Sequence, residues 1–241
     1  MPSPLSPLQN HLLAALPDEV FQRLLPHVRA ADLHPGQMLY ESGIAQGSAY
    51  FPVSCTVSLL HVMENGATAE VAVVGSEGLL GFSMLMGGEP RPCRAVVLHG
   101  GGGFLLSAQR LQEEFNRAGA LMQLLLRYTQ AFICQVSQTA VCNRHHAIDQ
   151  QLCRWLLLSV DRQPGRDLLM TQELIASMLG VRREGITEAA GKLQHAGLIN
   201  YRRGHIKVLD RAGLEARACE CYAAVEREYR RLLPAPRAIG H

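Results

Sequence analysis

The stretch that most constrains the fold runs from Thr171 to Asp210 and has the pattern of a helix, a tight turn, a second helix and a hairpin. Thr171 can cap the first helix, because its hydroxyl can accept a hydrogen bond from an amide that the first turn leaves free. Gly180 stands where the chain turns sharply and can adopt a positive φ. Apolar residues recur at helical spacing on both sides of this glycine, at Ile175, Met178, Leu179, Ile186, Ala190 and Leu193. This combination predicts a helix-turn-helix.

The outer face of the second predicted helix is polar. Donors and acceptors near the N-terminus of such a helix can reach base edges in a DNA major groove. The following segment, 201–205 (YRRGH), predicts a basic hairpin tip that could contact backbone phosphates. An ordinary helical hairpin with a solvated charged face is the alternative. The candidate DNA-binding residues are Thr171, Arg182, Arg183, Glu184, Thr187, Glu188, Lys192, Arg202, Arg203 and His205.

Charge is distributed unevenly along the 241 residues, although the formal net charge is only +2. The first 110 residues hold five arginines against eight acidic side chains, whereas the remainder holds eighteen basic against thirteen acidic side chains. An acidic first half and a basic second half suit a sensor joined to a domain that binds a polyanion. With 48% hydrophobic and 18% charged residues, the chain is expected to be globular and long enough for two modest domains.

The cysteines do not form a recognisable metal motif. No Cys-x-x-Cys occurs, and no set of cysteines and histidines has the spacing of a zinc site. Cys219 and Cys221 stand two apart on a predicted helix and should not face each other, while His145 and His146 should point apart. No metal site is therefore expected. The odd number of seven cysteines and the lack of a secretory segment favour a reduced, cytoplasmic setting, and no apolar run is long enough to span a bilayer.

Residues 31–107 differ in residue pattern from the helical segments on either side. Short apolar runs alternate with Gly, Pro and Asn, and Glu64-Asn65-Gly66 between two alternating runs predicts a tight hairpin. We expect a β-roll here, preceded by short helices within residues 10–27.

A long helical segment follows, because no Gly or Pro occurs between Ala120 and Gln163. Its apolar stripe needs a partner. A second copy of the chain would give a coiled-coil-like dimer seam, and burial against the β-roll is the alternative. Residues 143–147 (NRHHA) predict a hinge, and Asp210 can cap a last amphipathic helix that runs through Tyr229. The stripe consists of Leu121, Leu125, Tyr128, Phe132, Val136 and Thr139.

The order of β-roll, long helix and helix-turn-helix with a wing resembles the Crp–Fnr superfamily of bacterial transcription regulators. The resemblance implies an α+β fold with a cyclic-nucleotide-binding-like jelly roll at 10–118, a dimerisation helix and hinge at 119–146, and a winged helix-turn-helix with a C-terminal helix at 147–232. It also implies a cytoplasmic homodimer on pseudo-palindromic double-stranded DNA, with RNA polymerase as a further partner.

The resemblance assigns roles to particular recognition residues. Arg183 and Glu184 match the Arg and Glu that the family commonly has early in the recognition helix. Arg183 could contact a guanine through two hydrogen bonds, and Glu184 could accept from a cytosine amino group. Glu188 departs from the pattern, because the family often has Arg there. We therefore expect a half-site that differs from the best-known ones.

The sensor segment departs further from the members that bind cyclic nucleotides. Gly81 matches the family's Gly, but Phe82 replaces the Glu that takes the ribose hydroxyl, and Glu77 lies too early to substitute. Arg94 is the best candidate for a phosphate contact and Arg91 the second; Tyr128 on the long helix completes the candidate effector site. A cyclic nucleotide stays possible, and no iron–sulfur cluster or haem is predicted.

The expected function is that of a dimeric, sequence-specific DNA-binding transcription regulator. Its β-roll would sense an effector and move the two recognition helices through the hinge. The alternative is a ligand-binding sensor whose winged helix contacts proteins rather than DNA. An enzyme is not expected, because no set of residues suggests catalysis and the glycines at 100–103 lack the Gly-Lys-Ser/Thr of a phosphate-binding loop.

Overall fold

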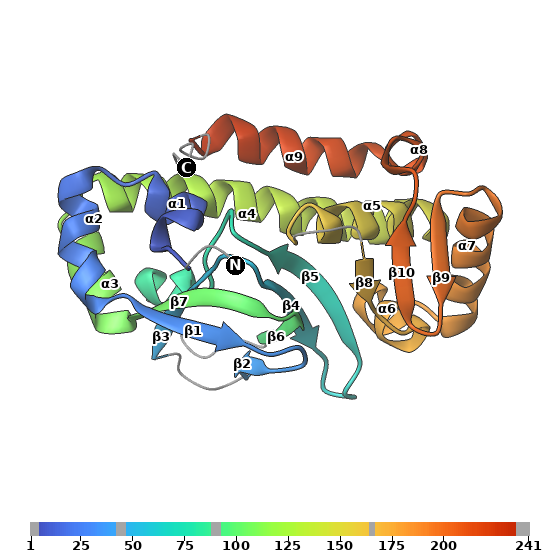
Figure 1. Cartoon of the computed structure of the whole chain (residues 1–241), viewed down its shortest axis with the longest axis horizontal. Coiled ribbons are helices and arrows are strands. Elements are labelled where there is room, and N and C mark those ends of the chain that lie inside the picture. The colour runs from blue at the N-terminus through green and yellow to red at the C-terminus, as the bar shows by residue number, and fades with distance from the viewer. Residues whose placement is uncertain (1–4, 42–46, 88–92, 164–166, 235–241) are drawn as a thin grey trace.

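The computed structural model describes residues 5–41, 47–87, 93–163 and 167–234. An N-terminal β domain, a long helix and a C-terminal domain of helices with a small sheet follow one another along the chain, as Figure 1 shows. The prediction of an α+β fold with these three parts is confirmed.

Two antiparallel sheets form the β domain. Their strand orders are β1-β7-β3 and β2-β6-β4-β5. The predicted turn at Glu64–Gly66 joins β4 to β5: Gly66 adopts φ 82°, and the Met63 amide donates to the Ala67 carbonyl at 2.8 Å. The strands are β1 (Arg29–Leu33), β2 (Met38–Tyr40), β3 (Ser48–Pro52), β4 (Thr56–Val62), β5 (Thr68–Val74), β6 (Cys93–His99) and β7 (Gly101–Ser107).

Short helices close the ends of this β domain. Asn10 caps α1 with its side-chain oxygen, and its amide nitrogen donates to the carbonyls of Pro52 and Gly78, both at 2.9 Å. The predicted helices within residues 10–27 are therefore confirmed and tied to the sheets. The helical elements are η1 (Pro7–Gln9), α1 (His11–Ala14), α2 (Asp18–Leu24), η2 (Leu25–His27), η3 (Phe82–Met86) and α3 (Ala108–Phe115).

The long helix α4 (Ala120–His145) has two apolar faces, and the stripe predicted to form a dimer seam is buried within the chain. Leu121, Leu125 and Tyr128 of the predicted seam are at most 2% exposed, because they pack against the β domain within the chain. Phe132 and Val136 also pack against the β domain, so the alternative of burial against the β-roll is correct for this stripe. Among the described residues, no helix combines the length and apolarity needed to cross a membrane.

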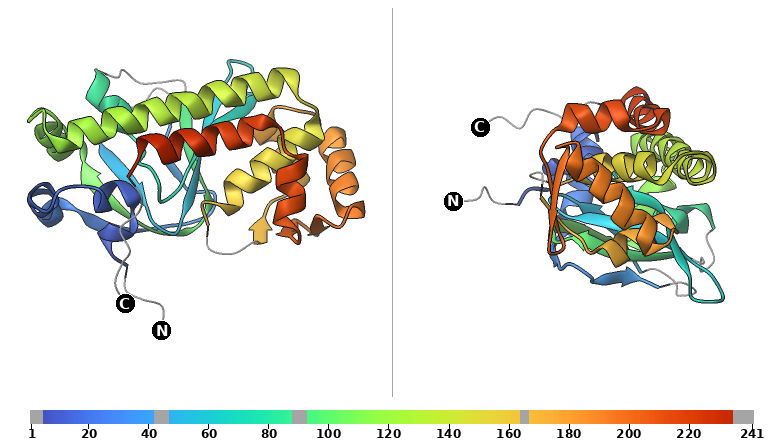
Figure 2. Two further views of the ribbon diagram at one scale, coloured as in Figure 1. Left: turned by 90° about the horizontal axis from the view of Figure 1, so that it is seen from above. Right: turned by 90° about the vertical axis from the view of Figure 1, so that its right-hand side faces the viewer.

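Most of the segment predicted as a hinge, residues 143–147, is helical. Helix α4 continues through Asn143 to His145, and only His146 and Ala147 adopt extended backbone before α5 (Ile148–Val160) begins. Helix α9 (Glu220–Leu232) runs back along α4, as Figure 1 and the left panel of Figure 2 show, and the Tyr229 hydroxyl donates to Gln135 Oε1 at 3.0 Å.

The C-terminal domain contains the helix-turn-helix and a three-stranded sheet with the order β8-β10-β9. The sequence predicted the hairpin of this sheet but not the strand β8, which has only three residues and no alternating apolar pattern. The elements are β8 (Asp167–Leu169), α6 (Gln172–Leu179), α7 (Arg183–His195), β9 (Ile199–Arg202), β10 (His205–Val208) and α8 (Arg211–Arg217).

The single C-terminal helix of the sequence analysis is in fact two helices. Asp210 caps α8, as predicted, by accepting from the Gly213 amide at 2.9 Å. The chain then breaks, because Ala218 and Cys219 adopt extended backbone before α9 begins. The expectation that Cys219 and Cys221 point apart is wrong for the same reason: both are at most 5% exposed and form one cluster with Cys142.

The helix-turn-helix packs against the β4–β5 hairpin. Thr68 and Ser177 share a hydrogen bond of 2.7 Å between their hydroxyls, and a Cβ at Gly180 would lie 3.5 Å from the Ala69 methyl. One hydrophobic core contains Val73 of β5 together with side chains of α5, α6 and α7. The helix-turn-helix is therefore held in place by direct packing against the β domain.

Candidate nucleic-acid interface

The first helix of the motif begins and ends as the sequence predicted. The Thr171 hydroxyl accepts a hydrogen bond from the Leu174 amide at 3.2 Å. Gly180 terminates α6 in the left-handed conformation with φ 66°, and the Val181 amide then donates to the Ala176 carbonyl at 3.0 Å. A β-carbon at position 180 would be strained at this φ. The turn thus fixes the direction in which α7 leaves α6.

The N-terminal turn of α7 presents its polar side chains to solvent. Arg182 is the N-cap residue, and Arg183 and Glu184 occupy the first turn; all three are exposed. The Arg183 Nε lies 4.0 Å from Glu173 Oε2. With side chains 64% and 77% exposed, this ion pair is weak. The guanidinium can therefore exchange this carboxylate for a base edge or a phosphate.

Thr187 is exposed but already forms a hydrogen bond within the chain. Its hydroxyl donates to Gln172 Oε1 at 2.7 Å, which links the second helix to the first turn of α6. Arg183 and Thr187 of α7 thus each contact a residue at the start of α6, Glu173 and Gln172 respectively. Neither Glu173 nor Gln172 was among the candidate DNA-binding residues. Their place directly after the capping Thr171 was the available signal.

Glu188 forms an ion pair one turn along α7 with Lys192, with 2.7 Å between Oε1 and Nζ. This contact raises the pKa of Lys192 through a hydrogen bond from the ammonium to the carboxylate. In the free chain the carboxylate of Glu188 therefore offsets part of the positive potential of the recognition helix. Both side chains are exposed, so either can rearrange on DNA.

The wing is a two-residue hairpin. Arg203 and Gly204 have φ 52° and 80°, the positive values that the tightest β-hairpin turns require. The Met170 amide donates to the Gly204 carbonyl at 2.7 Å, and the Tyr201 hydroxyl donates to the Met170 carbonyl at 2.9 Å. These bonds hold the wing beside the start of α6, with Arg202, Arg203 and His205 exposed.

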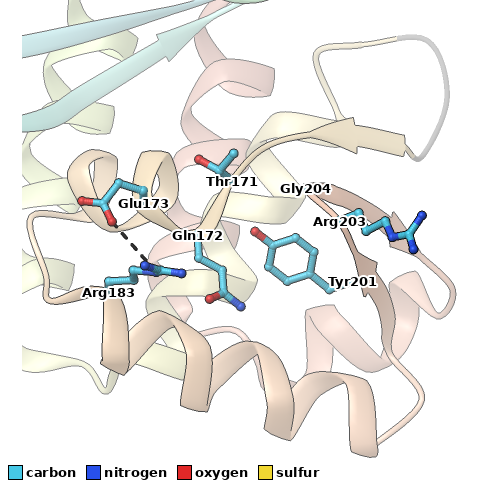
Figure 3. Close-up of a pocket in the computed structure, with 7 residues that line it drawn as sticks. All are labelled: Thr171, Gln172, Glu173, Arg183, Tyr201, Arg203 and Gly204. Atoms are coloured by element: carbon cyan, nitrogen blue, oxygen red, sulfur yellow. Dashed lines mark ion pairs between the residues drawn. The ribbon is translucent and has the colours of Figure 1, made fainter.

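Figure 3 shows that the start of α6, the start of α7 and the wing surround one open groove. The structure therefore brings Thr171, Arg183 and Arg203 of the predicted set to a single surface. Tyr201, which sequence analysis placed only within the wing, contributes an aromatic ring to the groove. Its full lining is Thr171, Gln172, Glu173, Arg183, Tyr201, Arg203 and Gly204.

Two of the predicted effector residues, Phe82 and Tyr128, lie in one buried aromatic cluster. The rings of Phe82 and Tyr128 meet edge to face with centroids 5.4 Å apart, and Phe132 packs on Phe82 at 5.1 Å. The Tyr128 hydroxyl donates to the Leu79 carbonyl at 3.0 Å. Burial raises the pKa of Tyr128 well above its usual value, so the phenol stays neutral. Gly81 precedes η3 with φ 93°, which brings Phe82 to these rings.

Arg94, the best candidate for a phosphate contact, is already paired with a carboxylate. Arg94 forms an ion pair with Glu41, with 2.9 Å between Nη2 and Oε2. Arg91 lies outside the described residues. Glu77, which the sequence analysis considered only as a substitute ligand, contacts the buried Arg162 at 2.6 Å. This carboxylate therefore joins the β domain to the end of α5.

A sensor-type β domain, a long helix and an exposed helix-turn-helix with a wing define the class of a DNA-binding regulator. Two family descriptions match in the same order: the cyclic nucleotide-binding domain over residues 31–117 and the Crp-like helix-turn-helix domain over residues 150–217. The chain belongs to the Crp–Fnr superfamily of transcription regulators.

Solved structures share this fold at low sequence identity. A Crp/Fnr-family chain from Eubacterium rectale is 16% identical, with a TM-score of 0.67 over 86% of this chain and 96% of that chain. FixK2 from Bradyrhizobium japonicum is 14% identical, with a TM-score of 0.65 over 80% and 98%. The c-di-GMP-responsive regulator CLP from Xanthomonas campestris is 17% identical, with a TM-score of 0.61 over 80% and 99%. No relative was found among curated proteins.

Proposed function

We propose that the chain works as a homodimer that reads a pseudo-palindromic DNA site with Arg183 and contacts phosphates with the wing. The observation that carries this proposal is the groove between α6, α7 and the wing. There Arg183 and Arg203 are exposed, and Arg183 is held only by a weak ion pair at 4.0 Å. The positive end of the α7 dipole also favours phosphate at this position.

The recognition helix combines donors and acceptors that can select a base sequence. Arg183 can donate two hydrogen bonds to a guanine, and Glu184 can accept from a cytosine amino group. Glu188 can accept but not donate, so the third position of the half-site should differ from one read by an arginine. Arg182 and Lys192, with Arg202, Arg203 and His205 of the wing, are positioned to meet phosphates.

The second apolar face of α4 supports dimerisation. Leu126, Ile133 and Val141 are large aliphatic side chains that are 52%, 52% and 48% exposed. Their spacing of seven and eight residues places them on one side of the helix. Paired α4 helices would bury this face and fix the distance between two recognition helices.

A binding assay with full-length protein tests the DNA-reading surface. Duplexes are selected from a random pool, and the enriched site is measured by gel shift at several salt concentrations. Arg183→Ala should weaken specific binding by about 1–3 kcal/mol, roughly five- to 150-fold, and relax the preference at one base pair. Arg110→Ala, which removes an exposed arginine of the β domain, is the matched control and should bind as the wild type does.

A stable complex with another protein, together with no enriched DNA site, would instead favour a winged helix that contacts proteins. The absence of an enriched DNA site would by itself refute the DNA-reading proposal. Unchanged specificity in Arg183→Ala would also refute the role of this residue.

Light scattering coupled to size exclusion tests the dimer face. Ile133→Glu places a charge on the exposed stripe and should convert the dimer to a monomer. Met63→Glu is the matched control, because Met63 is equally exposed at 56% but lies in the β4–β5 turn. A wild-type monomer at micromolar concentration, or a dimer that survives Ile133→Glu, would rule out this seam.

The β domain is proposed to transmit an effector signal through α4 rather than to catalyse a reaction. Phe82 and Tyr128 contact each other where η3 meets α4, so a ligand that displaces Phe82 would change the packing of this helix. Arg94 could contact an anionic group of the ligand if Glu41 is displaced. RNA polymerase is the expected protein partner of the DNA-bound dimer.

A further inference from the structure

Four metal-ligand side chains from two distant segments of the chain lie close together where α4 ends. They are Cys142 and His146, near the end of α4, and Cys219 and Cys221, at the start of α9. One ligand atom from each lies within 4.8 Å of all the others. We propose that these three thiols and one imidazole form a tetrahedral Cys3His site for a zinc ion.

The distances suit a tetrahedral ion of this size. Zinc–sulfur bonds of about 2.3 Å place two sulfur ligands roughly 3.7 Å apart, and zinc–nitrogen bonds are shorter. The Sγ atoms of Cys142 and Cys219 are 3.5 Å apart, and Cys221 Sγ lies 3.6 Å from His146 Nδ1. Small side-chain adjustments are enough to place four ligands around one centre.

The backbone explains how these residues meet. Cys142 and His146 are one helical turn apart, so their side chains lie on the same face. Cys219 is the N-cap residue of α9 and Cys221 lies in its first turn. The break between α8 and α9 therefore turns both sulfurs toward α4. A continuous helix would have separated them, which is why their spacing gave no metal motif.

A second layer of contacts supports a ligand role for His146. Its Nε2 lies 3.4 Å from the carboxylate of Glu220, which leaves Nδ1 directed at Cys221. A metal-binding histidine usually donates its other ring nitrogen to a carboxylate or carbonyl in this way. The side-chain amide of Gln151 donates to the His146 carbonyl at 2.8 Å and so stabilises the turn after α4.

A buried arginine supplies the charge that such a site requires. Arg154 is 3% exposed, donates to the Thr139 hydroxyl, and has no hydrogen-bond partner for Nε. The guanidinium interacts electrostatically with Cys142 of the cluster and with the buried Glu70. Three thiolates, a neutral imidazole and Zn²⁺ carry a net charge of −1, which a nearby guanidinium offsets.

The location gives the ion a mechanical role. His146 is half of the two-residue connection between α4 and α5, and α9 follows the winged sheet through α8. Zinc would join the end of the long helix to the segment that leaves the DNA-binding domain. It would thereby fix the angle between α4 and the helix-turn-helix.

Metal content and cobalt spectroscopy test the site with full-length protein that is purified and kept under reducing, oxygen-free conditions. Elemental analysis should find one zinc per chain. Cobalt added to the metal-free protein should give the intense visible bands of tetrahedral thiolate coordination and saturate at one ion per chain. Zinc should then displace cobalt.

Matched variants identify the ligands. Cys219→Ser should lower the metal affinity at least about a hundredfold, whereas Cys134→Ser, on α4 but outside the cluster, should leave it unchanged. Glu220→Gln changes only a side chain that is 79% exposed and should cost about tenfold through the orientation of His146. Because Glu220→Gln leaves the core intact, it separates metal binding from folding.

Several results would overturn the proposal. They are no tetrahedral cobalt spectrum, a spectrum that Cys219→Ser leaves intact, iron with acid-labile sulfide in place of zinc, or a disulfide between Cys142 and Cys219 in protein kept reduced. None of these measurements depends on DNA binding, so failure of the metal site and failure of the DNA-reading proposal are distinguishable.

Discussion

The winged helix-turn-helix and the interface between the β domain and α5 use charged side chains in opposite ways. At the proposed DNA-binding surface, Arg183 and Lys192 are 64% and 55% exposed, and their partners Glu173 and Glu188 are 77% and 70% exposed. At the interface, Arg162 is 7% exposed and contacts Glu77 at 2.6 Å. Charge on the first surface is available to a polyanion, whereas charge in the interface holds two parts of the chain together.

This difference separates two kinds of variant. Substitutions in the interface should alter stability because they leave buried groups without partners. Substitutions on the DNA-binding surface should alter affinity and leave stability nearly unchanged.

Glu77→Ala should have the largest effect on stability. It leaves the Arg162 guanidinium buried without its carboxylate, which costs about 3–5 kcal/mol of unfolding free energy. Urea unfolding followed by circular dichroism measures this loss. Glu113→Ala is the control, since it breaks an exposed ion pair with Arg110 and should leave the midpoint unchanged. Equal midpoints for both variants would contradict the distinction.

Glu70 should make stability depend on pH. Its carboxylate accepts from Ser58 Oγ and Trp155 Nε1, yet burial raises its pKa from 4.5 to about 7. Between these values the unfolded chain releases a proton that the folded chain retains, so stability is highest in acid and falls as the pH rises through 7. Other groups also titrate, and Glu70→Gln isolates this contribution.

Urea midpoints at several pH values for wild type and Glu70→Gln provide the measurement. The fall in stability from about pH 5 to about pH 8 should be smaller in Glu70→Gln. The same pH profile in both proteins would show that Glu70 has the same pKa when folded and unfolded.

Arg203→Ala should change DNA binding without changing stability. Its side chain is exposed at the wing and is expected to contact a phosphate. Affinity should fall about equally for all sequences, and the slope of log affinity against log salt should fall by about one. Loss of specificity at a single base pair instead would assign Arg203 to base recognition.

Glu188→Ala should have the smallest effect. It removes a negative charge from α7 and frees the Lys192 ammonium from its contact of 2.7 Å. Binding to DNA without a preferred sequence should strengthen by less than about tenfold. Fluorescence anisotropy at low salt measures this change, and a weaker complex would indicate that Glu188 orders Lys192 for binding.

The sequence was most informative where local chemistry decides the conformation. Thr171 and Gly180 act through neighbouring backbone groups, so their roles in the cap and turn were predictable and are observed. The hairpin at Glu64–Gly66 follows from the same kind of local signal. These elements explain why the fold could be predicted without knowing the packing of the domains.

Contacts between distant segments were not predictable in the same way. Both faces of α4 have apolar residues at helical spacing, and only the position of the β domain shows that Tyr128 is buried while Ile133 is exposed. The pair of Glu77 and Arg162 and the convergence of Cys142 with Cys219 likewise depend on how α5 and α9 return to the β domain and α4. The periodicity of apolar residues along one segment does not indicate which distant segment it will contact.

Selection of DNA sites by the full-length protein tests whether the chain reads DNA as a homodimer. A homodimer with two recognition helices should enrich duplexes that contain two inverted half-sites, about 10 base pairs from centre to centre. Arg183→Ala should reduce this enrichment, whereas Arg110→Ala should not. An unenriched pool, or one half-site without its inverted copy, would contradict the account.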